Sequence, residues 1–312
     1  MIISAAANNH FSPPEWNVVK DVKSDIPIVL VTRLNGYVFN EDLLSLERYI
    51  LVCMSEYGWD WDLENSGTHI WGVNTNQFPH FKDNCEWIKF DKWVGENKPI
   101  LFFKRELLKR DATDWLVPID YPNYQEPIPV QTKEQFDNRP LEVCMMWGRS
   151  SEHRTRVHSK IWANSSQNGA SICDNIYQFN AFLHHESNPK KWVTFHQPHY
   201  QREDIKQLLI INGLSKLSIS LWGCGVKCFR STGESPVNSI MVKYKDNLKW
   251  SEDWIHGYNC IDVEIGKEIE GIEAALKKND LYEIYVKSVQ TANGYNANYY
   301  TKTIENLINE RI

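Results

Sequence analysis

A continuous apolar run early in the chain predicts a strand that is buried on both faces. Residues 26–32 read IPIVLVT, a β-branched run without polar alternation, which is typical of a parallel sheet. After a polar loop, residues 41–57 place leucine, tyrosine, isoleucine and valine at helical spacing, so a helix is expected there. Strand, loop and helix in this order are the opening of an α/β domain.

The rest of the first half offers shorter patterns. Residues 99–104, PILFFK, predict a second buried strand. Short strand candidates lie at 69–73 and 87–90, and residues 104–110 favour a short helix.

A proline-rich stretch then interrupts the pattern. Five prolines lie among polar residues between Pro118 and Pro140, a composition not expected to hold a regular helix and typical of a linker or a stiff crossing segment. The domain boundary is therefore placed here, with a first domain at 1–138 and a second at 139–290.

The second half restarts the α/β pattern. Strands are predicted at 141–147, 192–196, 217–222 and 239–244, and helices at 151–162, 201–212, 264–278, 280–290 and 299–312. Two α/β halves suggest a two-domain enzyme with its site in the cleft. Because ligands of open parallel sheets bind at the carboxyl ends of the strands, the residues after Trp147 and Trp222 are the ones to examine.

The net charge and the aromatic content limit the classes of partner that the chain is expected to bind. The net charge of −6 over 312 residues argues against a protein whose main task is to hold nucleic acid, which usually needs a broad basic surface. The 13 Trp, 14 Tyr and 12 Phe either fill cores or line a groove in which sugar rings or bases stack.

Cysteine usage and the chain start bear on the compartment. Seven cysteines are scattered without CxxC spacing, which disfavours zinc and fits a reducing compartment. The first residues lack the pattern of a signal peptide, and no apolar run is long enough to span a membrane. A cytoplasmic protein is expected. The Asn, Lys and Ile usage suggests an AT-rich coding genome such as that of a virus, in which case the compartment is the host cytoplasm.

The first candidate site follows the strand predicted at 141–147. Gly148 permits a tight turn and a close backbone approach. A cationic cluster comes next: Arg149, Arg154, Arg156 and Lys160. Guanidinium donors beside a helix N-terminus suit a diphosphate. The alternative is a solvated basic helix face, and Arg154 and Arg156, two residues apart, cannot share one face.

The second candidate site follows the strand predicted at 217–222. Its glycine turn and cations are Gly223, Gly225, Lys227 and Arg230. Glu234 is expected near a helix N-terminus, where a carboxylate is stabilised and can accept hydrogen bonds from the two hydroxyls of a ribose. Phosphate oxygens would meet the backbone amides of Thr232, Gly233 and Ser235. The alternative is a capped helix without a ligand.

These motifs resemble a known family. The stretch at 200–235, YQREDIKQLLIINGLSKLSISLWGCGVKCFRSTGES, resembles the C-terminal nucleotide-sugar motif of glycosyltransferases with the B-type fold (GT-B), and most closely the exostosin-like group. The residues that match the order of that motif are Ser215, Lys216, Gly223, Gly225, Arg230 and Glu234. Gly148 and Arg149 with Arg154 resemble the group's "G-(K/R)…R" segment. The likeness covers about residues 140–262, and the run after Glu234 departs from the group by lacking a glycine.

The resemblance implies a fold and an activity. The fold would be α/β, with two Rossmann-like domains facing each other across a cleft and a C-terminal helix at 291–312 crossing back to the first domain. The activity would be transfer of a hexose or pentose from a UDP- or GDP-sugar to a hydroxyl of a glycan or glycoprotein, inverting and independent of metal. No tightly bound cofactor is expected. Asp60-Trp61-Asp62 has DxD spacing, but no apolar strand leads into it, so it is not expected to bind metal.

An inverting reaction needs a general base, which the first domain would supply. The candidates are Glu41, Asp42, Asp62, His69 and His80. Glu41 and Asp42 have a simpler interpretation as a helix N-terminus, and each histidine as a structural or surface residue. A retaining reaction would need no such base, and this alternative stays open.

Three other functions remain. The acceptor can be a modified base in DNA, against which the acidic net charge counts mildly. The chain can be a noncatalytic lectin-like module that binds sugars through Trp and Asn, although a lectin has no need of two basic clusters at strand ends. A nucleotide-sugar epimerase would share the nucleotide contacts but would show acid and base groups beside the sugar.

Overall fold

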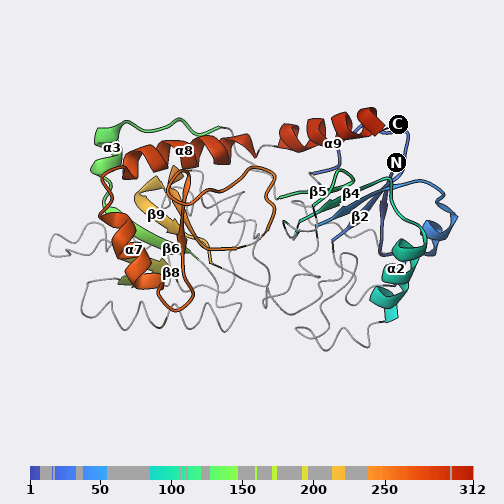
Figure 1. The fold of residues 1–312 in the computed structure, drawn as a ribbon, viewed down its shortest axis with the longest axis horizontal. Coiled ribbons are helices and arrows are strands. Elements are labelled where there is room, and N and C mark those ends of the chain that lie inside the picture. Colours follow the sequence, from blue (N-terminus) through green and yellow to red (C-terminus); the bar gives the residue numbers. More distant parts are fainter. Residues whose placement is uncertain are drawn as a thin grey trace. The chain divides into compact units, whose positions relative to one another are not determined.

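The computed structural model of this chain (Figure 1) describes its helices and strands over most, but not all, of the sequence. The described residues are 1–7, 16, 18–32, 38–54, 85–105, 107, 109, 112–120, 127–146, 159, 171–173, 192–195, 213–221, 238–246, 248–295 and 297–311.

The chain forms two compact units, each assembled from separate stretches of sequence. Unit 1 comprises Met1–Pro122, Asn247–Asp253 and Tyr295–Ile312, and unit 2 comprises Asn123–Asp246 and Trp254–Gly294. Each unit contains one parallel sheet. The predicted α/β class with two parallel sheets is therefore confirmed.

The sheet of unit 1 runs in sequence order. Its strands are β1 (Ile2–Ser4), β2 (Ile28–Val31), β3 (Ile50–Cys53), β4 (Leu101–Lys104) and β5 (Leu116–Pro118), and every neighbouring pair is parallel. All residues of β2, β3 and β4 are buried, because these strands lie inside the sheet. The strands expected at 26–32 and 99–104 are thus confirmed.

The helix expected at 41–57 is wrong. Residues Glu41–Ser45 form a short 3₁₀ helix, η1, and the following apolar run forms β3 in the middle of the sheet. The run from Tyr49 to Met54 is apolar at every position and wholly buried, so its backbone hydrogen bonds are made with β2 and β4 rather than within a helix.

The short strand expected at 87–90 is also wrong, because these residues belong to helix α2 (Cys85–Glu96). Phe90, Trp93 and Val94 recur at helical spacing and are buried in the core, where Trp93 stacks on Tyr49 with ring centroids 4.6 Å apart. The aromatic side chains here fill a core, one of the two roles expected for them.

Helix α9 (Ala297–Arg311) belongs to unit 1. Its Ile304 and Ile308 are buried, and Glu305 accepts a hydrogen bond of 2.8 Å from the backbone of Lys23. The terminal helix expected at 299–312 is confirmed, and it begins two residues earlier than predicted.

The sheet of unit 2 is doubly wound around its first strand. Its strands are β6 (Leu141–Met146), β7 (Ser171–Cys173), β8 (Trp192–Phe195), β9 (Ser215–Ile219), β10 (Ile240–Tyr244) and β11 (Cys260–Val263), in the order β11-β10-β9-β6-β8-β7. All neighbours are parallel. Four of the six strands were predicted, whereas β7 and β11 were not.

Helices α7 (Glu268–Leu276) and α8 (Leu281–Gly294) pack beside this sheet and confirm the two helices expected at 264–290. Figure 1 shows α8 beside the strands of this sheet. Ser288 on α8 donates a 3.1 Å hydrogen bond to the carbonyl of Ser239, directly before β10.

The proline-rich stretch holds a regular helix after all. Lys133–Asp137 form α3, which begins with a capping box between Thr132 and Gln135. The prolines lie outside these residues, so the helix needs no amide that a proline lacks. The expectation of no helix at 118–140 is therefore wrong over this turn.

Arg139 ties α3 to the sheet. Its buried guanidinium lies over the rings of Phe136 and Tyr285, at 4.9 and 4.5 Å, and donates to the backbone carbonyls of Ser215 and Asn238 at 2.5 and 2.6 Å. Burial lowers the pKa of Arg139 to about 10.

Some of the predicted elements fall on residues that the structure does not describe. The helices expected at 151–162 and 201–212 and the strand expected at 69–73 fall almost wholly outside the described residues, and the helix expected at 104–110 is described only in part. Within the described residues, no helix combines the length and the apolar character that crossing a bilayer requires.

Candidate functional site

The strand order of unit 2 reverses between β6 and β9. From β6 the chain passes to β7 and β8 on one side of the sheet, and then returns to β9, β10 and β11 on the other. β6 and β9 are parallel neighbours, with Val143 opposite Leu217 and Cys144 opposite Ser218. Crossover connections leave such a pair of strands in opposite directions, and ligands of doubly wound sheets bind outside the carboxyl ends of the two strands.

Both predicted nucleotide segments follow these two strands along the chain. The first starts directly after Met146, the last residue of β6, and the second starts after Leu221, two residues past the end of β9. The sequence patterns and the sheet topology thus point independently to the same edge of unit 2.

The nucleotide-binding residues predicted from the sequence all lie outside the described residues. They are Gly148, Arg149, Arg154, Arg156, Gly223, Gly225, Lys227, Arg230, Thr232, Gly233, Glu234 and Ser235. The structure brings together the strands that lead into the two segments, and the convergence of the side chains stays a prediction.

Two of the five candidate bases are described. Glu41 and Asp42 are exposed and form the first turn of η1. The side chain of Asn40 accepts a 3.0 Å hydrogen bond from the amide of Asp42, and its own amide group donates to the carbonyl of Ser4. Glu41 and Asp42 thus begin a short 3₁₀ helix and not the longer helix expected at 41–57. Asp62, His69 and His80 lie outside the described residues, and the choice of base stays a prediction.

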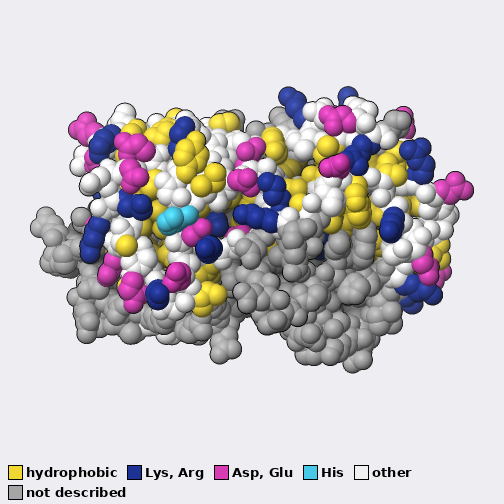
Figure 2. Space-filling model, in the orientation of Figure 1, with side chains coloured by type: hydrophobic (Ala, Val, Ile, Leu, Met, Phe, Trp, Pro, Cys, Tyr) yellow, Lys and Arg dark blue, Asp and Glu magenta, His cyan; other side chains and the backbone are white. Residues whose placement is uncertain are grey.

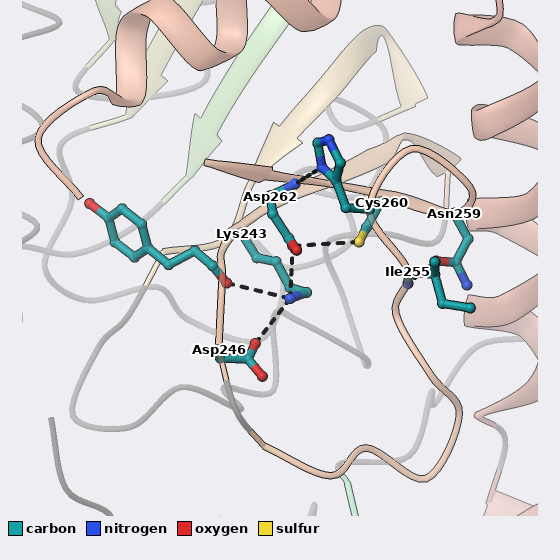
Figure 3. Close-up of polar contacts among 8 residues, drawn as sticks. Lys243, Asp246, Ile255, Asn259, Cys260 and Asp262 are labelled. Carbon is teal, nitrogen blue, oxygen red and sulfur yellow. Dashed lines mark hydrogen bonds and ion pairs between the residues drawn. The ribbon is translucent and has the colours of Figure 1, made fainter. Parts of the chain in front are cut away.

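The sequence reasoning missed a buried charged cluster in β10 and β11 (Figure 3). The ammonium of Lys243 lies 3.0 Å from a carboxylate oxygen of Asp246 and 2.8 Å from one of Asp262. Lys243 and Asp262 face each other across the two strands, and their side chains are 7% and 19% exposed. Burial this deep requires both ions to be paired.

The cluster is built to hold charge rather than to exchange protons. Burial acts to lower the pKa of Lys243, but Asp246 and Asp262 outweigh it and raise that pKa above its ordinary value. The ammonium also lies 3.4 Å from the carbonyl oxygen of Tyr244, so its three donors are each directed at an oxygen. Lys243 is consequently a fixed cation, unsuited to act as a base.

Residues 256 and 257 pair with the outer edge of β11. His256 accepts a 2.9 Å hydrogen bond through Nδ1 from the amide of Asp262, and the amide of Gly257 donates to the carbonyl of Cys260. The Cys260 thiol lies 3.8 Å from Asp262, and burial raises its pKa. Cys260 therefore stays a thiol and is a poor nucleophile or metal ligand. Among the residues that the structure describes, no three His, Cys, Asp or Glu side chains are grouped to hold a metal ion.

A signal for this cluster exists in the sequence. The strands IMVKY and CIDV each carry one charge inside an apolar run, and a charge in a buried strand requires a partner. The pairing itself depends on the register of β10 and β11, which the sequence does not reveal.

On the surface, charges of both signs are intermingled. Figure 2 shows described Lys and Arg side chains interspersed with Asp and Glu on the face in view. This face of the described residues lacks the broad single-sign surface that binding to nucleic acid needs.

Comparison with known proteins adds a distant structural likeness. The sequence matches no protein-family model, and the search of curated proteins gave no match. Among solved structures, the chain is similar to a mutant of S. aureus TarM in complex with fondaparinux, α-GlcNAc-glycerol and UDP, at 11% identity and a TM-score of 0.49 over 94% of this chain and 58% of that one. It is also similar to the pneumococcal O-GlcNAc transferase GtfA in complex with UDP and GlcNAc, at 11% identity and a TM-score of 0.44 over 91% and 56%.

A third similar structure is the glycosyltransferase SnogD from Streptomyces nogalater, at 10% identity and a TM-score of 0.39 over 85% of this chain and 73% of that one. The chain spans between 56% and 59% of the length of the first four matched chains. At these identities the alignments transfer no residue role to this chain.

Proposed function

We propose that this chain is a glycosyltransferase that holds a UDP- or GDP-sugar at the carboxyl edge of the unit 2 sheet. One observation supports this proposal most strongly. The two segments with the sequence pattern of a nucleotide-sugar site follow β6 and β9, which are adjacent parallel strands at the reversal of strand order. Two segments well separated in sequence thereby start from one edge of one sheet.

In this proposal the cationic side chains stabilise the leaving diphosphate. Arg149, one of Arg154 and Arg156, and Arg230 donate charge-assisted hydrogen bonds to the diphosphate. Negative charge on the diphosphate grows as the bond to the sugar breaks, so these groups stabilise the transition state more than the bound donor. Fixed guanidinium groups thereby supply positive charge that a metal ion supplies elsewhere, and the proposed reaction is independent of metal.

The second segment fixes the nucleoside. Glu234 accepts hydrogen bonds from the two ribose hydroxyls, and the amides of Thr232, Gly233 and Ser235 meet phosphate oxygens. Gly148, Gly223 and Gly225 allow the backbone to approach the ligand closely. Lys227 adds a point charge near the phosphates.

The proposed chemistry is inverting transfer to a hydroxyl of a glycan or glycoprotein. The acceptor oxygen forms a bond to the anomeric carbon while the bond from that carbon to the β-phosphate oxygen breaks, and the nucleoside diphosphate leaves with the electron pair. A carboxylate or histidine of unit 1 takes the acceptor proton, and Glu41, Asp42, Asp62, His69 and His80 are the candidates. Inversion and the acceptor class rest on the family resemblance.

The test is release of nucleoside diphosphate from a panel of UDP-, GDP- and CMP-sugars, with and without EDTA. One donor class should give slow release that EDTA leaves unchanged. Arg149→Met and Arg230→Met should each lower the rate at least about 100-fold, the range found on removing one transition-state donor. Arg311→Met, at the exposed end of α9, is the matched control and should leave the rate unchanged. Binding of a sugar without release of nucleotide from any donor would favour the lectin-like alternative and reject the proposal.

A further inference from the structure

The motif that suggested the donor site includes a pair, Ser215-Lys216, that the proposed function does not use. The pair opens β9, whereas the second nucleotide segment starts only after Leu221. At about 3.3 Å per residue of extended chain, Ser215 lies roughly 20 Å before that segment. Ser215 is also fully buried. Any role of the pair is therefore played at the amino end of the sheet.

Arg139 joins the amino ends of three adjacent strands in unit 2. It lies two residues before β6, and its Nη1 donates hydrogen bonds to the backbone carbonyls of Ser215 and Asn238 at 2.5 and 2.6 Å. Ser215 is the first residue of β9, and Asn238 lies two residues before β10. Since β10, β9 and β6 are neighbours in the sheet, one guanidinium spans the starts of all three.

The other donors of this guanidinium are also directed at uncharged oxygens. Nε and Nη2 donate to Oε1 of Gln131 at 3.0 and 2.8 Å, and Nη2 donates to Oδ1 of Asn238 at 3.2 Å. Within the described part of the chain, the partners of Arg139 include no carboxylate. A buried cation held by neutral oxygens depends on geometry, because no opposite charge compensates a lost hydrogen bond.

The surroundings hold the planar guanidinium in one orientation. It lies over the rings of Phe136 and Tyr285. The hydroxyl of Tyr285 accepts a 3.1 Å hydrogen bond from the amide of Gln131 and donates one of 3.1 Å to Oδ1 of Asn238, so both partners of Arg139 are themselves fixed. A lysine at position 139 would keep the charge but lose the plane and the fork of donors.

The opposite ends of the same strands lead into the proposed donor site, because the two nucleotide segments follow β6 and β9. We propose that Arg139 is a positioning residue for that site. By fixing the amino ends of β6, β9 and β10, it fixes the register and spacing from which the two segments start. The inference rests on the proposed function. Without the fork, the carbonyls of Ser215 and Asn238 lose this donor, which favours a shift of the strands towards other partners.

A ligand that contacts both segments senses their spacing, whereas a ligand that contacts one segment does not. In the proposed site the diphosphate lies between Arg149 of the first segment and Arg230 of the second. The nucleoside meets only Glu234 of the second. A displacement of about 1 Å costs about 100-fold in the rate of a well-oriented reaction. The ratio of the affinities for nucleoside diphosphate and bare nucleoside therefore separates positioning from overall stability.

The experiment measures the affinities for UDP, GDP and the matching nucleosides by titration calorimetry and equilibrium dialysis. Arg139→Lys should weaken binding of the diphosphate that wild type binds by about 10-fold or more, and should change the nucleoside affinity less than about twofold. Ser288→Ala is the matched control. It removes a hydrogen bond from α8 to the carbonyl of Ser239 at the same end of the sheet, but that bond does not join β6 to β9. Both affinities should stay those of wild type.

Tyr285→Phe provides a second, milder variant. It keeps the ring beside Arg139 and removes the hydroxyl that orients Gln131 and Asn238. It should shift the affinity ratio in the same direction by about two- to fivefold, the effect of one hydrogen bond. Circular dichroism and thermal unfolding establish that each variant is folded at the assay temperature. If Arg139→Lys is not folded, Tyr285→Phe decides by the same criterion.

Two kinds of failure are distinguishable. Equal losses of diphosphate and nucleoside affinity, or affinities unchanged from wild type, would overturn the positioning role of Arg139. Failure of wild type to bind either diphosphate would instead reject the proposed function, and this inference with it. The wild-type titration tells the two apart.

Discussion

Lys243 shows how a single residue sets the local chemistry of unit 2. Its ammonium lies between Asp246 and Asp262 in a buried site, where each ion would be costly alone. The same contacts join the end of β10 to β11. The cluster is therefore a brace at the carboxyl end of the sheet, one strand away from β9.

The brace can be tested by removing the cation. Lys243→Met leaves two buried carboxylates without a counter-ion, which should lower the free energy of unfolding by about 3–5 kcal/mol. Urea denaturation measures this directly. Lys267→Met is the control, because Lys267 pairs with Glu264 on the exposed surface and should barely change the midpoint. Equal midpoints for the two variants would show that the buried ion pairs of Lys243 stabilise the fold no more than the exposed pair of Lys267.

The buried Tyr300 makes the free energy of unfolding depend on pH in the alkaline range. Burial raises the pKa of Tyr300 well above its ordinary value of 10, and the Asp120 carboxylate raises it further. The folded state therefore keeps the proton that the unfolded state loses. Its contribution to stability is complete below pH 10 and is lost as the pH rises beyond that value.

Tyr300→Phe should consequently flatten the fall of the unfolding free energy above about pH 10, by up to about 1.4 kcal/mol per pH unit. Urea denaturation at about pH 8 to 11 measures the slope. Tyr258→Phe, at a tyrosine that is 51% exposed, is the comparison and should follow wild type. An unchanged slope in Tyr300→Phe would contradict the burial argument.

At the scale of elements, α7 and β11 approach closely because of one glycine. A Cβ on Gly271 would come within 2.8 Å of a methyl group of Val263, so the absence of a side chain lets the helix rest on the strand. The contact explains why an interior helix position carries a residue of low helix propensity.

Gly271→Ala should lower stability by about 1–3 kcal/mol, the usual cost of overpacking. Gly95→Ala, with open space around the new methyl group, should raise stability by about 0.5–1 kcal/mol because alanine favours helix. Thermal and urea unfolding of the two variants should therefore move in opposite directions. A stabilised Gly271→Ala would mean that α7 shifts freely over β11.

The sequence predicts buried strands best where an apolar run is short and bounded. β2, β4, β6 and β10 were found in this way, whereas Ile50–Cys53 was assigned to a helix. The apolar positions from Leu43 to Val52 fit a helical period, and periodicity alone does not separate a buried strand from a buried helix. Sheet pairing with β2 and β4 decides the matter, and that information is not local.

Around the candidate site, too, the sequence predicted one part of the structure and missed another. The strand ends before Gly148 and Gly223 were predicted because a strand followed by glycine and arginine is a local pattern. The Lys243 cluster was not predicted, because Lys243 and Asp262 come from different strands and meet only through the register of β10 and β11. The strands are thus readable from local sequence, whereas pairing across strands requires the structure.

At the scale of the whole molecule, each unit is completed by chain that returns from the other. Asn247–Asp253 and α9 both complete unit 1 after unit 2 has begun. The two units therefore cannot be separated by a single cut in the sequence. Expression of residues 1–122 alone would leave Asp120 without Ser251 and would remove Tyr295 from the core.

The central claim is that the segments after β6 and β9 hold one nucleotide. Titration calorimetry of UDP and GDP tests it most directly, with wild type, Arg149→Met, Glu234→Ala and the double variant. One nucleotide should bind to wild type with a stoichiometry of one. Each single variant should weaken binding about 10- to 100-fold, because a charge-assisted hydrogen bond contributes about 1.5–3 kcal/mol. Failure of wild type to bind either nucleotide, or binding by both single variants with wild-type affinity, would contradict the account.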